Sequence, residues 1–207
     1  MSDILSQIDA VHRELGRTGE AHRMLLRREY DAPVEDVWDA LTDPDRITRW
    51  FMPVSGDLHL GGHYQLEGNA GGDILACDPP KLIKVTWIYG EPTGLSELEV
   101  RLSPAGERTT LEIEHVAEVP DDFWKIYGPG ATGIGWELGL LGLQEHLAGQ
   151  DRTPEEKANA HTDPQLREYM TRSGDAWAEV HRASGASEEE VENGRKAVLA
   201  AYVPDLG

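Results

Sequence analysis

Apolar residues recur with two different periods along this chain, and the change of period divides it into parts. Near the start they follow a helical spacing: Ile4, Leu5, Ile8, Val11 and Leu15, with Gly16 as a stop. This spacing predicts an amphipathic helix from residue 4 to residue 15. Between Arg23 and Tyr30 the apolar residues fall mostly on one parity, which predicts a first strand.

Two short helices are expected after this strand. Pro33 suits a first helical turn, and an apolar stripe follows it, formed by Val34, Val37, Trp38 and Leu41. Asp43 and Pro44 then have the residue types of an N-cap and a first-turn proline. They predict a second helix that carries Ile47, Trp50 and Phe51.

The period then changes from 3.6 to 2. Glycine-rich or proline-rich breaks separate segments of strand length, at 61–62, 71–72, 79–80, 92–94 and 104–106. Too few residues lie between the segments for crossover helices, so we expect an antiparallel, meandering sheet. Three sets of residues share its buried face: Ile83, Val85, Trp87 and Tyr89; Leu98, Val100 and Leu102; Leu111, Ile113 and His115.

A loop through Pro120, Trp124 and Tyr127 is expected next, followed by a long helix from Thr132, its cap, to Ala148. Its stripe consists of Trp136, Leu140, Leu143 and Leu147. Gly135, Gly139 and Gly142 interrupt the helix, and each interior glycine costs up to about 1 kcal/mol relative to alanine. Two explanations stay open: the helix approaches the sheet closely, or the glycines leave room for a ligand.

Beyond residue 150 two further amphipathic helices are expected. Asp163 and Pro164 open the first, and Ser187 with Glu190 forms a capping box before the second. The helices either dock on the main domain or meet a second subunit, which leaves a homodimer through the terminal helices open. The prediction is an α+β protein with a central domain at residues 23–150 and helical extensions at 1–22 and 151–207.

Composition and charge exclude several classes of function. The net charge of −19 opposes binding to nucleic acid and to anionic membranes. No apolar run approaches the roughly 20 residues of a membrane-spanning helix, and the N-terminus lacks a secretory apolar region. We therefore expect a cytoplasmic protein without nucleic-acid or membrane partners.

Standard catalytic and metal-binding motifs are missing from the sequence. The eight histidines show no ligand-like pairing, and neither a phosphate-binding loop nor a nucleophile elbow occurs. Cys77 lies in a strand-like run and is expected to be buried and inert. We predict no metal site, no cofactor and no catalytic constellation.

Five segments together resemble one known family. They are 32–44, with the sequence APVEDVWDALTDP; 50–53, WFMP; the glycine pair 61–62; 72–87, with GDILACDPPKLI before TW; and 110–115. They resemble the group similar to the activator of heat-shock-protein-90 ATPase, within the START-like (SRPBCC) superfamily, over roughly residues 23–150. The resemblance implies the helix-grip fold, in which a curved sheet packs on a long C-terminal helix. It also implies a pocket between the two, but no particular reaction.

Candidate ligand-binding residues come from the elements that would converge on such a pocket: Trp50, Phe51, Trp87, Tyr89, His115, Trp124, Tyr127, Trp136 and Leu140. Aromatic walls with a few polar atoms suit a small hydrophobic or aromatic molecule, although large aromatic residues at these spacings are also ordinary core residues. Binding of such a molecule is the leading hypothesis. The alternatives are a cofactor-independent cyclase or hydrolase that uses His115 with Tyr89 or Tyr127, and a chaperone-regulating interaction protein that uses the tail helices.

Overall fold

The computed structural model describes residues 4–91 and 94–205, and its centre is one curved antiparallel sheet. The strands lie in the order β1-β2-β8-β7-β6-β5-β4-β3. Their bounds are His12–Thr18 (β1), Ala21–Tyr30 (β2), Val54–Gly56 (β3), His63–Leu66 (β4), Gly71–Asp78 (β5), Leu82–Thr86 (β6), Ser96–Ala105 (β7) and Arg108–Ala117 (β8). Part of the break expected at 92–94 lies outside the described residues.

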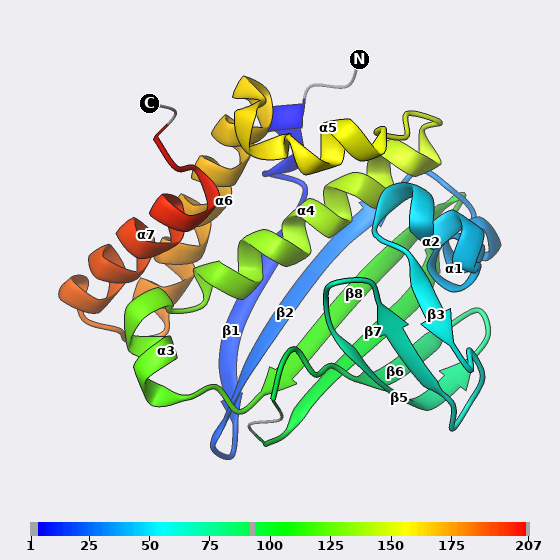
Figure 1. The fold of residues 1–207 in the computed structure, drawn as a ribbon, viewed down its shortest axis with the longest axis horizontal. Coiled ribbons are helices and arrows are strands. Elements are labelled where there is room, and N and C mark those ends of the chain that lie inside the picture. Colours follow the sequence, from blue (N-terminus) through cyan, green and yellow to red (C-terminus); the bar gives the residue numbers. More distant parts are fainter. Residues whose placement is uncertain (1–3, 92–93, 206–207) are drawn as a thin grey trace.

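The helices cover the concave face of this sheet. Their bounds are Val34–Thr42 (α1), Pro44–Trp50 (α2), Asp121–Tyr127 (α3), Gly130–Leu147 (α4), Pro154–Ala158 (α5), Pro164–Ala183 (α6) and Glu188–Tyr202 (α7), with 3-10 turns at Ile4–Gln7 (η1) and Ala160–Thr162 (η2). Figure 1 shows α4 lying across the sheet, with α6 and α7 beyond it. The predicted α+β architecture, a curved sheet gripping a long helix, is confirmed. Among the described residues, no helix is long and apolar enough to cross a membrane.

The predicted N-terminal helix from residue 4 to residue 15 is wrong. Only η1 is helical there, and His12–Thr18 forms β1, which pairs with β2 through a turn at Gly19. Val11 and Leu15 pack into the core under the sheet, and Arg13, which lies between them on the same parity, forms a buried ion pair. A strand with one buried face normally has apolar residues at every second position. The charged Arg13 breaks this alternation, so the strand cannot be recognised from the sequence.

Four smaller predictions are also wrong. The segment expected to be a loop contains α3, and α4 begins at Gly130 with Pro129 as its N-cap, so Thr132 is not the cap. Gly71 and Gly72 do not separate strands. They begin β5, where a Cβ on Gly72 would lie 2.2 Å from the carbonyl oxygen of Thr86. Cys77 is exposed and not buried. It lies in the part of β5 that pairs with β6 but not with β4, which reaches only residues 71–73.

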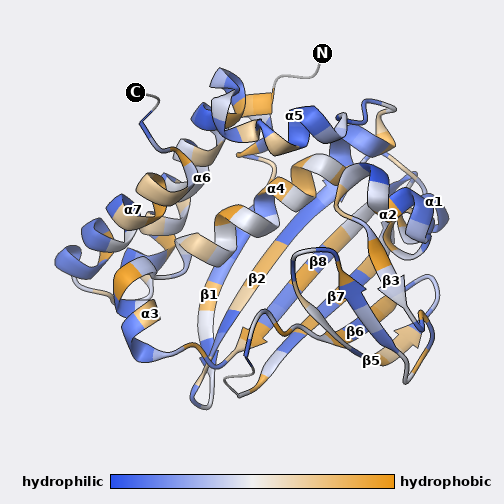
Figure 2. Ribbon diagram, viewed as in Figure 1, coloured by the Kyte–Doolittle hydropathy of each residue, from blue (hydrophilic) through white to orange (hydrophobic). Residues whose placement is uncertain are grey.

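The predicted inward face of the sheet is largely confirmed. Leu98, Leu102, Leu111, Ile113 and His115 are all buried under α4, and Figure 2 shows hydrophobic positions on the strands beneath this helix. Tyr89 was predicted on this inward face but does not lie on it. β6 ends at Thr86, and Tyr89 is 72% exposed.

Helix α4 is buried on two sides. Trp136, Leu140 and Leu143 belong to the core over the sheet. Ile134 and Leu141 belong to a second core, which α6, α7 and η1 complete. A helix that packs against two layers is apolar around most of its circumference, which explains why its stripe is poorly defined in the sequence.

The C-terminal helices dock on α4 and not only on one another. Asp163 caps α6 by accepting hydrogen bonds from the backbone of Gln165 and Leu166, and the Ser187–Glu190 capping box opens α7, as predicted. Trp177 of α6 is fully buried against α4, where a Cβ on Gly133 would lie 2.3 Å from its ring. Glycine is required at this position because the indole touches the helix backbone.

A fully buried carboxylate joins three layers of the fold. Glu137 of α4 accepts two hydrogen bonds from Arg13 of β1, at 2.6 Å and 2.8 Å, and a third from the Trp177 indole at 2.7 Å. A buried charge needs such complete pairing, since its desolvation is otherwise uncompensated.

The three glycines of α4 singled out in the sequence face other helices and not the sheet. A Cβ on Gly142 would lie 2.7 Å from the carbonyl oxygen of Trp50 in α2. A Cβ on Gly139 would meet only the Phe51 ring at 3.7 Å, and one on Gly135 only the Tyr202 hydroxyl at 3.3 Å. Of these three positions, only 142 lies so close to the backbone of another helix that glycine is required.

Replacing Glu137 by alanine should lower the free energy of unfolding by about 3–5 kcal/mol, because it leaves the Arg13 guanidinium buried without a partner. Urea titration followed by circular dichroism measures the loss. The matched control is Glu168→Ala, which breaks an exposed pair with Arg172 and should cost less than about 1 kcal/mol. Equal losses in the two variants would contradict a central role for the buried pair.

Alanine substitutions should separate the two kinds of glycine in α4. Gly139→Ala should stabilise the protein by up to about 1 kcal/mol, because the new methyl group meets only an ordinary contact and alanine favours a helix. Gly142→Ala should destabilise it by about 1 kcal/mol or more, because α2 must move. Thermal melts of the two variants decide the question, and the same sign of change in both would be the contrary result.

Candidate functional site

An apolar cavity of about 330 Å³ lies between the sheet and α4. Its lining includes Trp38, Leu41, Val54, Tyr64, Leu66, Val85, Leu98, Val100, Ile113, Trp136, Leu140 and Leu143. We call it the inner cavity. Side chains alternate along a strand, so residues of one parity on each strand point into it. They are Ile83, Val85 and Trp87; Leu98 and Val100; and Leu111 and Ile113.

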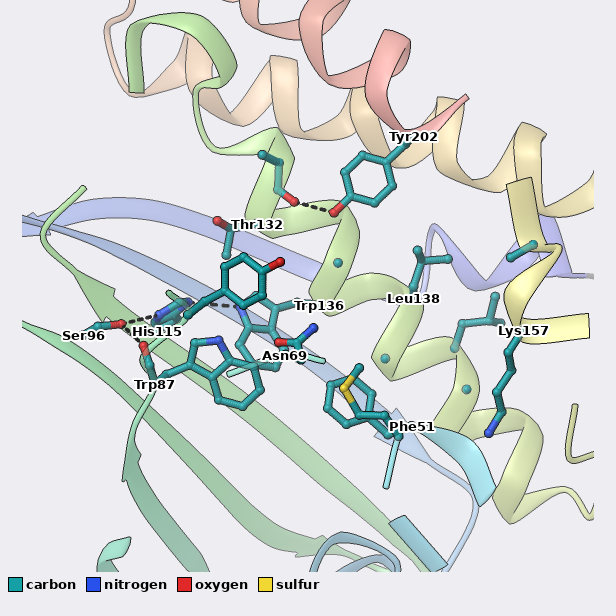
Figure 3. Close-up of a pocket in the computed structure, with 18 of the residues that line it drawn as sticks. Phe51, Asn69, Trp87, Ser96, His115, Thr132, Trp136, Leu138, Lys157 and Tyr202 are labelled. Atoms are coloured by element: carbon teal, nitrogen blue, oxygen red, sulfur yellow. Dashed lines mark hydrogen bonds between the residues drawn. The ribbon is translucent and has the colours of Figure 1, made fainter. Parts of the chain in front are cut away.

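A larger groove of about 770 Å³ follows the side of α4 that carries Gly135, Gly139 and Gly142. We call it the outer groove. Its walls include Phe51, Asn69, Trp87, Tyr89, Ser96, His115, Thr132, Trp136, Lys157, Leu166 and Tyr202 (Figure 3). Elements on both sides of the helix therefore build it, and they include the C-terminal extension.

A layer of large side chains separates the two spaces. Trp50, Phe51, Trp87 and Trp136, with Gly139, line both of them. The Trp87 and Trp136 rings lie 4.8 Å apart at 53°, and the Trp50 and Phe51 rings lie 5.3 Å apart. Tilted aromatic contacts of this kind hold the rings in fixed orientations. We call this layer the aromatic partition.

His115 holds one side of the partition through a chain of hydrogen bonds (Figure 3). The Trp136 indole donates to its Nδ1 at 3.2 Å, and its Nε2 lies 3.3 Å from the Ser96 hydroxyl. That hydroxyl donates its proton to the Trp87 carbonyl at 2.5 Å. Since an indole nitrogen only donates and the hydroxyl has one proton, the imidazole must carry its own proton on Nε2.

Burial makes this histidine a poor acid–base group at neutral pH. Desolvation lowers the pKa of His115 from 6.5 to about 4, so the ring is neutral. Both of its nitrogens are engaged with protein groups. The arrangement orients two tryptophans, and it offers no free nitrogen for proton transfer.

The structure divides the predicted site residues into four groups. Trp50, Phe51, Trp87 and Trp136 line both spaces; Tyr89 and His115 line only the outer groove, and Leu140 only the inner cavity. Trp124 and Tyr127 line neither of them. Trp124 stacks on His22 with ring centroids 3.4 Å apart, and Tyr127 borders a separate space of about 10 Å³ under α6 and α7.

The separation of Tyr127 from His115 bears on the enzyme hypothesis, which requires polar atoms that converge on one empty point. Tyr127 and His115 face different spaces, and Tyr89 lies at the exposed rim. Among the described residues, no group of three or more His, Cys, Asp or Glu could hold a metal ion. The two spaces therefore do not bring the Tyr127 hydroxyl to His115.

Sequence reasoning missed several residues of the outer groove, among them Ser96, Asn69, Thr132 and Tyr202. Ser96 shares the parity of Leu98 and Val100, so the strand pattern could have revealed it. Tyr202 could not have been found, because only the docking of α7 brings its hydroxyl to the Ala131 carbonyl at 2.7 Å.

The buried imidazole should make stability depend on pH. The unfolded chain binds a proton near pH 6.5 and the folded chain only near pH 4, so stability is intact above 6.5 and is lost as the pH falls between these values. From pH 7 to pH 4.5 this group should cost on the order of 2 kcal/mol.

Chemical denaturation of the His115→Gln variant at both pH values tests this, because glutamine can still hydrogen-bond but does not titrate. The variant should lose less stability than the wild type on acidification. The control, His161→Gln at an exposed position, should follow the wild type. An unchanged acid sensitivity in His115→Gln would refute the assignment.

Comparison with known proteins gives the chain a family. A family model described as "Activator of Hsp90 ATPase homolog 1-like protein" matches residues 31–148, more than half of the chain. The crystal structure of CalU16 from Micromonospora echinospora is 38% identical with a TM-score of 0.66, covering 83% of this chain and 98% of CalU16. The solution structure of CalU16 is 35% identical with a TM-score of 0.71, covering 85% and 97%.

A more distant structure supports the fold alone. PFC0360w, an Hsp90 activator from Plasmodium falciparum, is 24% identical with a TM-score of 0.53, covering 61% of this chain and 96% of its own. No curated protein sequence matches the chain. The matched residues 31–148 include α1, α2, all the strands from β3 onward and α4, which are the elements that enclose the inner cavity. The chain therefore belongs to the family of proteins similar to the activator of Hsp90 ATPase homolog 1, with the helix-grip fold.

Proposed function

We propose that this protein binds a small, neutral, hydrophobic or aromatic molecule in the inner cavity. The observation that carries the proposal is an apolar space of about 330 Å³ between the sheet and α4. A dry cavity of about 150 Å³ is already large enough for benzene. Known ligand pockets begin at about 300 Å³, so a molecule of one or two rings fits this one.

The lining of the inner cavity supports a neutral and apolar ligand. Among its few polar groups, the Tyr64 hydroxyl is already used, because it donates to the Thr86 carbonyl at 2.8 Å. A charged ligand would lose its hydration in this space and find no group of opposite charge to pair with, and burial of an unpaired charge is unfavourable. Affinity would therefore come from apolar contact with Val100, Ile113 and Leu143 and from the aromatic partition.

Exposed apolar side chains mark a route to the cavity. Leu58 and Leu60, in the loop between β3 and β4, line the inner cavity and are 39% and 61% exposed. Exposed apolar groups gathered at the mouth of a cavity are typical of binding sites. A ligand could enter past this loop without disturbing α4.

The two other hypotheses have less support. For the enzyme that pairs His115 with Tyr89 or Tyr127, Tyr127 faces another space and Tyr89 is 72% exposed, while both nitrogens of His115 contact protein groups. The apolar stripes of α6 and α7 are buried on α4, so an interaction protein or homodimer would have to use the exposed faces of these helices. Chaperone regulation, like dimerisation, stays a prediction.

Naphthalene is a suitable probe of the inner cavity. Isothermal titration calorimetry should show one equivalent bound, with a negative heat-capacity change from the burial of apolar surface. Val100→Phe places a ring inside the cavity and should weaken binding at least tenfold, since it occupies the space of the ligand.

The matched control is Ser103→Phe, which adds the same ring to the exposed side of β7 and should leave naphthalene binding unchanged. Thermal melts confirm that both variants fold. Naphthalene that fails to bind the wild type, or that binds Val100→Phe as tightly as the wild type, would refute the proposal.

A further inference from the structure

The outer groove depends on the C-terminal extension, which lies outside the residues that define the family. Lys157 of α5, Leu166 of α6 and Tyr202 of α7 form part of its wall, whereas the family match ends at residue 148. Trp87 and Tyr89, at the end of β6, form part of the opposite wall. The groove is thus a feature that the extension adds to the helix-grip domain.

Glycines leave the α4 backbone accessible on the floor of this groove. A Cβ on Gly135 would have a single neighbour, the Tyr202 hydroxyl, and one on Gly139 would touch only the Phe51 ring. Tight packing therefore does not explain Gly139, and at Gly135 it involves only a side-chain hydroxyl that must shift slightly, unlike the backbone carbonyl at Gly142 and the buried ring at Gly133. A flat molecule could lie directly on this stretch of helix, where any larger side chain would obstruct it.

Aromatic rings border the same floor. Trp136 comes from α4 itself, and Trp87 lies beside it (Figure 3). Tyr89 also lines the groove and is 72% exposed. The exposed Tyr89 ring and the half-buried Trp87 ring offer stacking surfaces to a ligand in the groove, which favours an aromatic molecule.

The polar groups of the groove favour an uncharged ligand with hydrogen-bonding atoms. Within residues 4–91 and 94–205, the Thr132 hydroxyl and the Asn69 amide NH₂ make no hydrogen bond, and the Tyr202 oxygen can still accept one. At the α5 end, three of the ionic groups that line the groove already have protein partners. Arg152 pairs with Glu145, and Lys157 donates to the carbonyls of Thr48 and Arg49.

From these observations we propose that the outer groove is a second binding site, separate from the inner cavity, for a neutral polycyclic aromatic molecule with hydroxyl or carbonyl groups on its edge. The rings lie on the glycine floor between the Trp87 side and the extension. The edge oxygens bond to Thr132 and Asn69. The site requires α7 to be docked, because Tyr202 forms its upper wall.

The probe for this site is 3-hydroxyflavone, a neutral three-ring molecule whose fluorescence responds to hydrogen bonding. Titration of the full chain should show saturable binding of one equivalent that naphthalene does not displace. Gly135→Leu fills the floor with a good helix former and should weaken binding at least tenfold. Thr132→Val removes one hydroxyl at constant shape and should weaken it about fivefold.

Two controls separate this site from the inner cavity. Ala200→Leu adds the same bulk to an exposed position of α7 and should bind 3-hydroxyflavone like the wild type. Val100→Phe blocks the inner cavity and should also retain 3-hydroxyflavone, whereas Gly135→Leu should retain naphthalene. The two proposals can therefore fail independently.

Three results would overturn the second site. They are the absence of saturable 3-hydroxyflavone binding to the wild type, undiminished binding by Gly135→Leu, and loss of binding in Val100→Phe equal to that in Gly135→Leu. Thermal melts of each variant show whether a loss of binding reflects unfolding.

Discussion

The ion pair between Glu137 and Arg13 is the contact on which the arrangement of layers depends. Its carboxylate is fully buried and accepts hydrogen bonds from Arg13 of β1 and Trp177 of α6. Such a pair need not add net stability, since desolvation offsets much of its attraction. It does fix positions, because any shift of the edge strand, of α4 or of α6 would leave a buried charge without a partner.

Fixing α4 between two layers also determines where ligands can bind. The sheet covers one side of the helix and α6 with α7 another, whereas the side that carries Gly135 and Gly139 borders the outer groove. On the sheet side, the strands curve away from α4 and leave the inner cavity. Packing is dense where the ion pair holds the layers together and incomplete where the sheet curves and where glycines replace side chains.

The aromatic partition is a wall that the two spaces share. Trp136 lies between them, and its indole donates a hydrogen bond to the imidazole of His115. Desolvation keeps this imidazole neutral, so it stays a hydrogen-bond acceptor for the indole. The Ser96 hydroxyl continues this chain to the Trp87 backbone. The histidine thus holds Trp136 and Trp87, which line the spaces on both sides of the partition. Its position on the strand predicted that it points inward, but not that it holds these two residues.

The sequence alone determined the features that depend on neighbouring residues: the strand parities, the caps at Asp163 and Ser187, the long helix and the family. It also placed Trp50, Phe51, Trp87 and Trp136 near one site. Only the tertiary structure decided that this site is two spaces, that β1 is a strand and that Tyr202 reaches α4. These outcomes depend on contacts between residues distant in the chain, such as Arg13 with Glu137, and local periodicity carries no information about them.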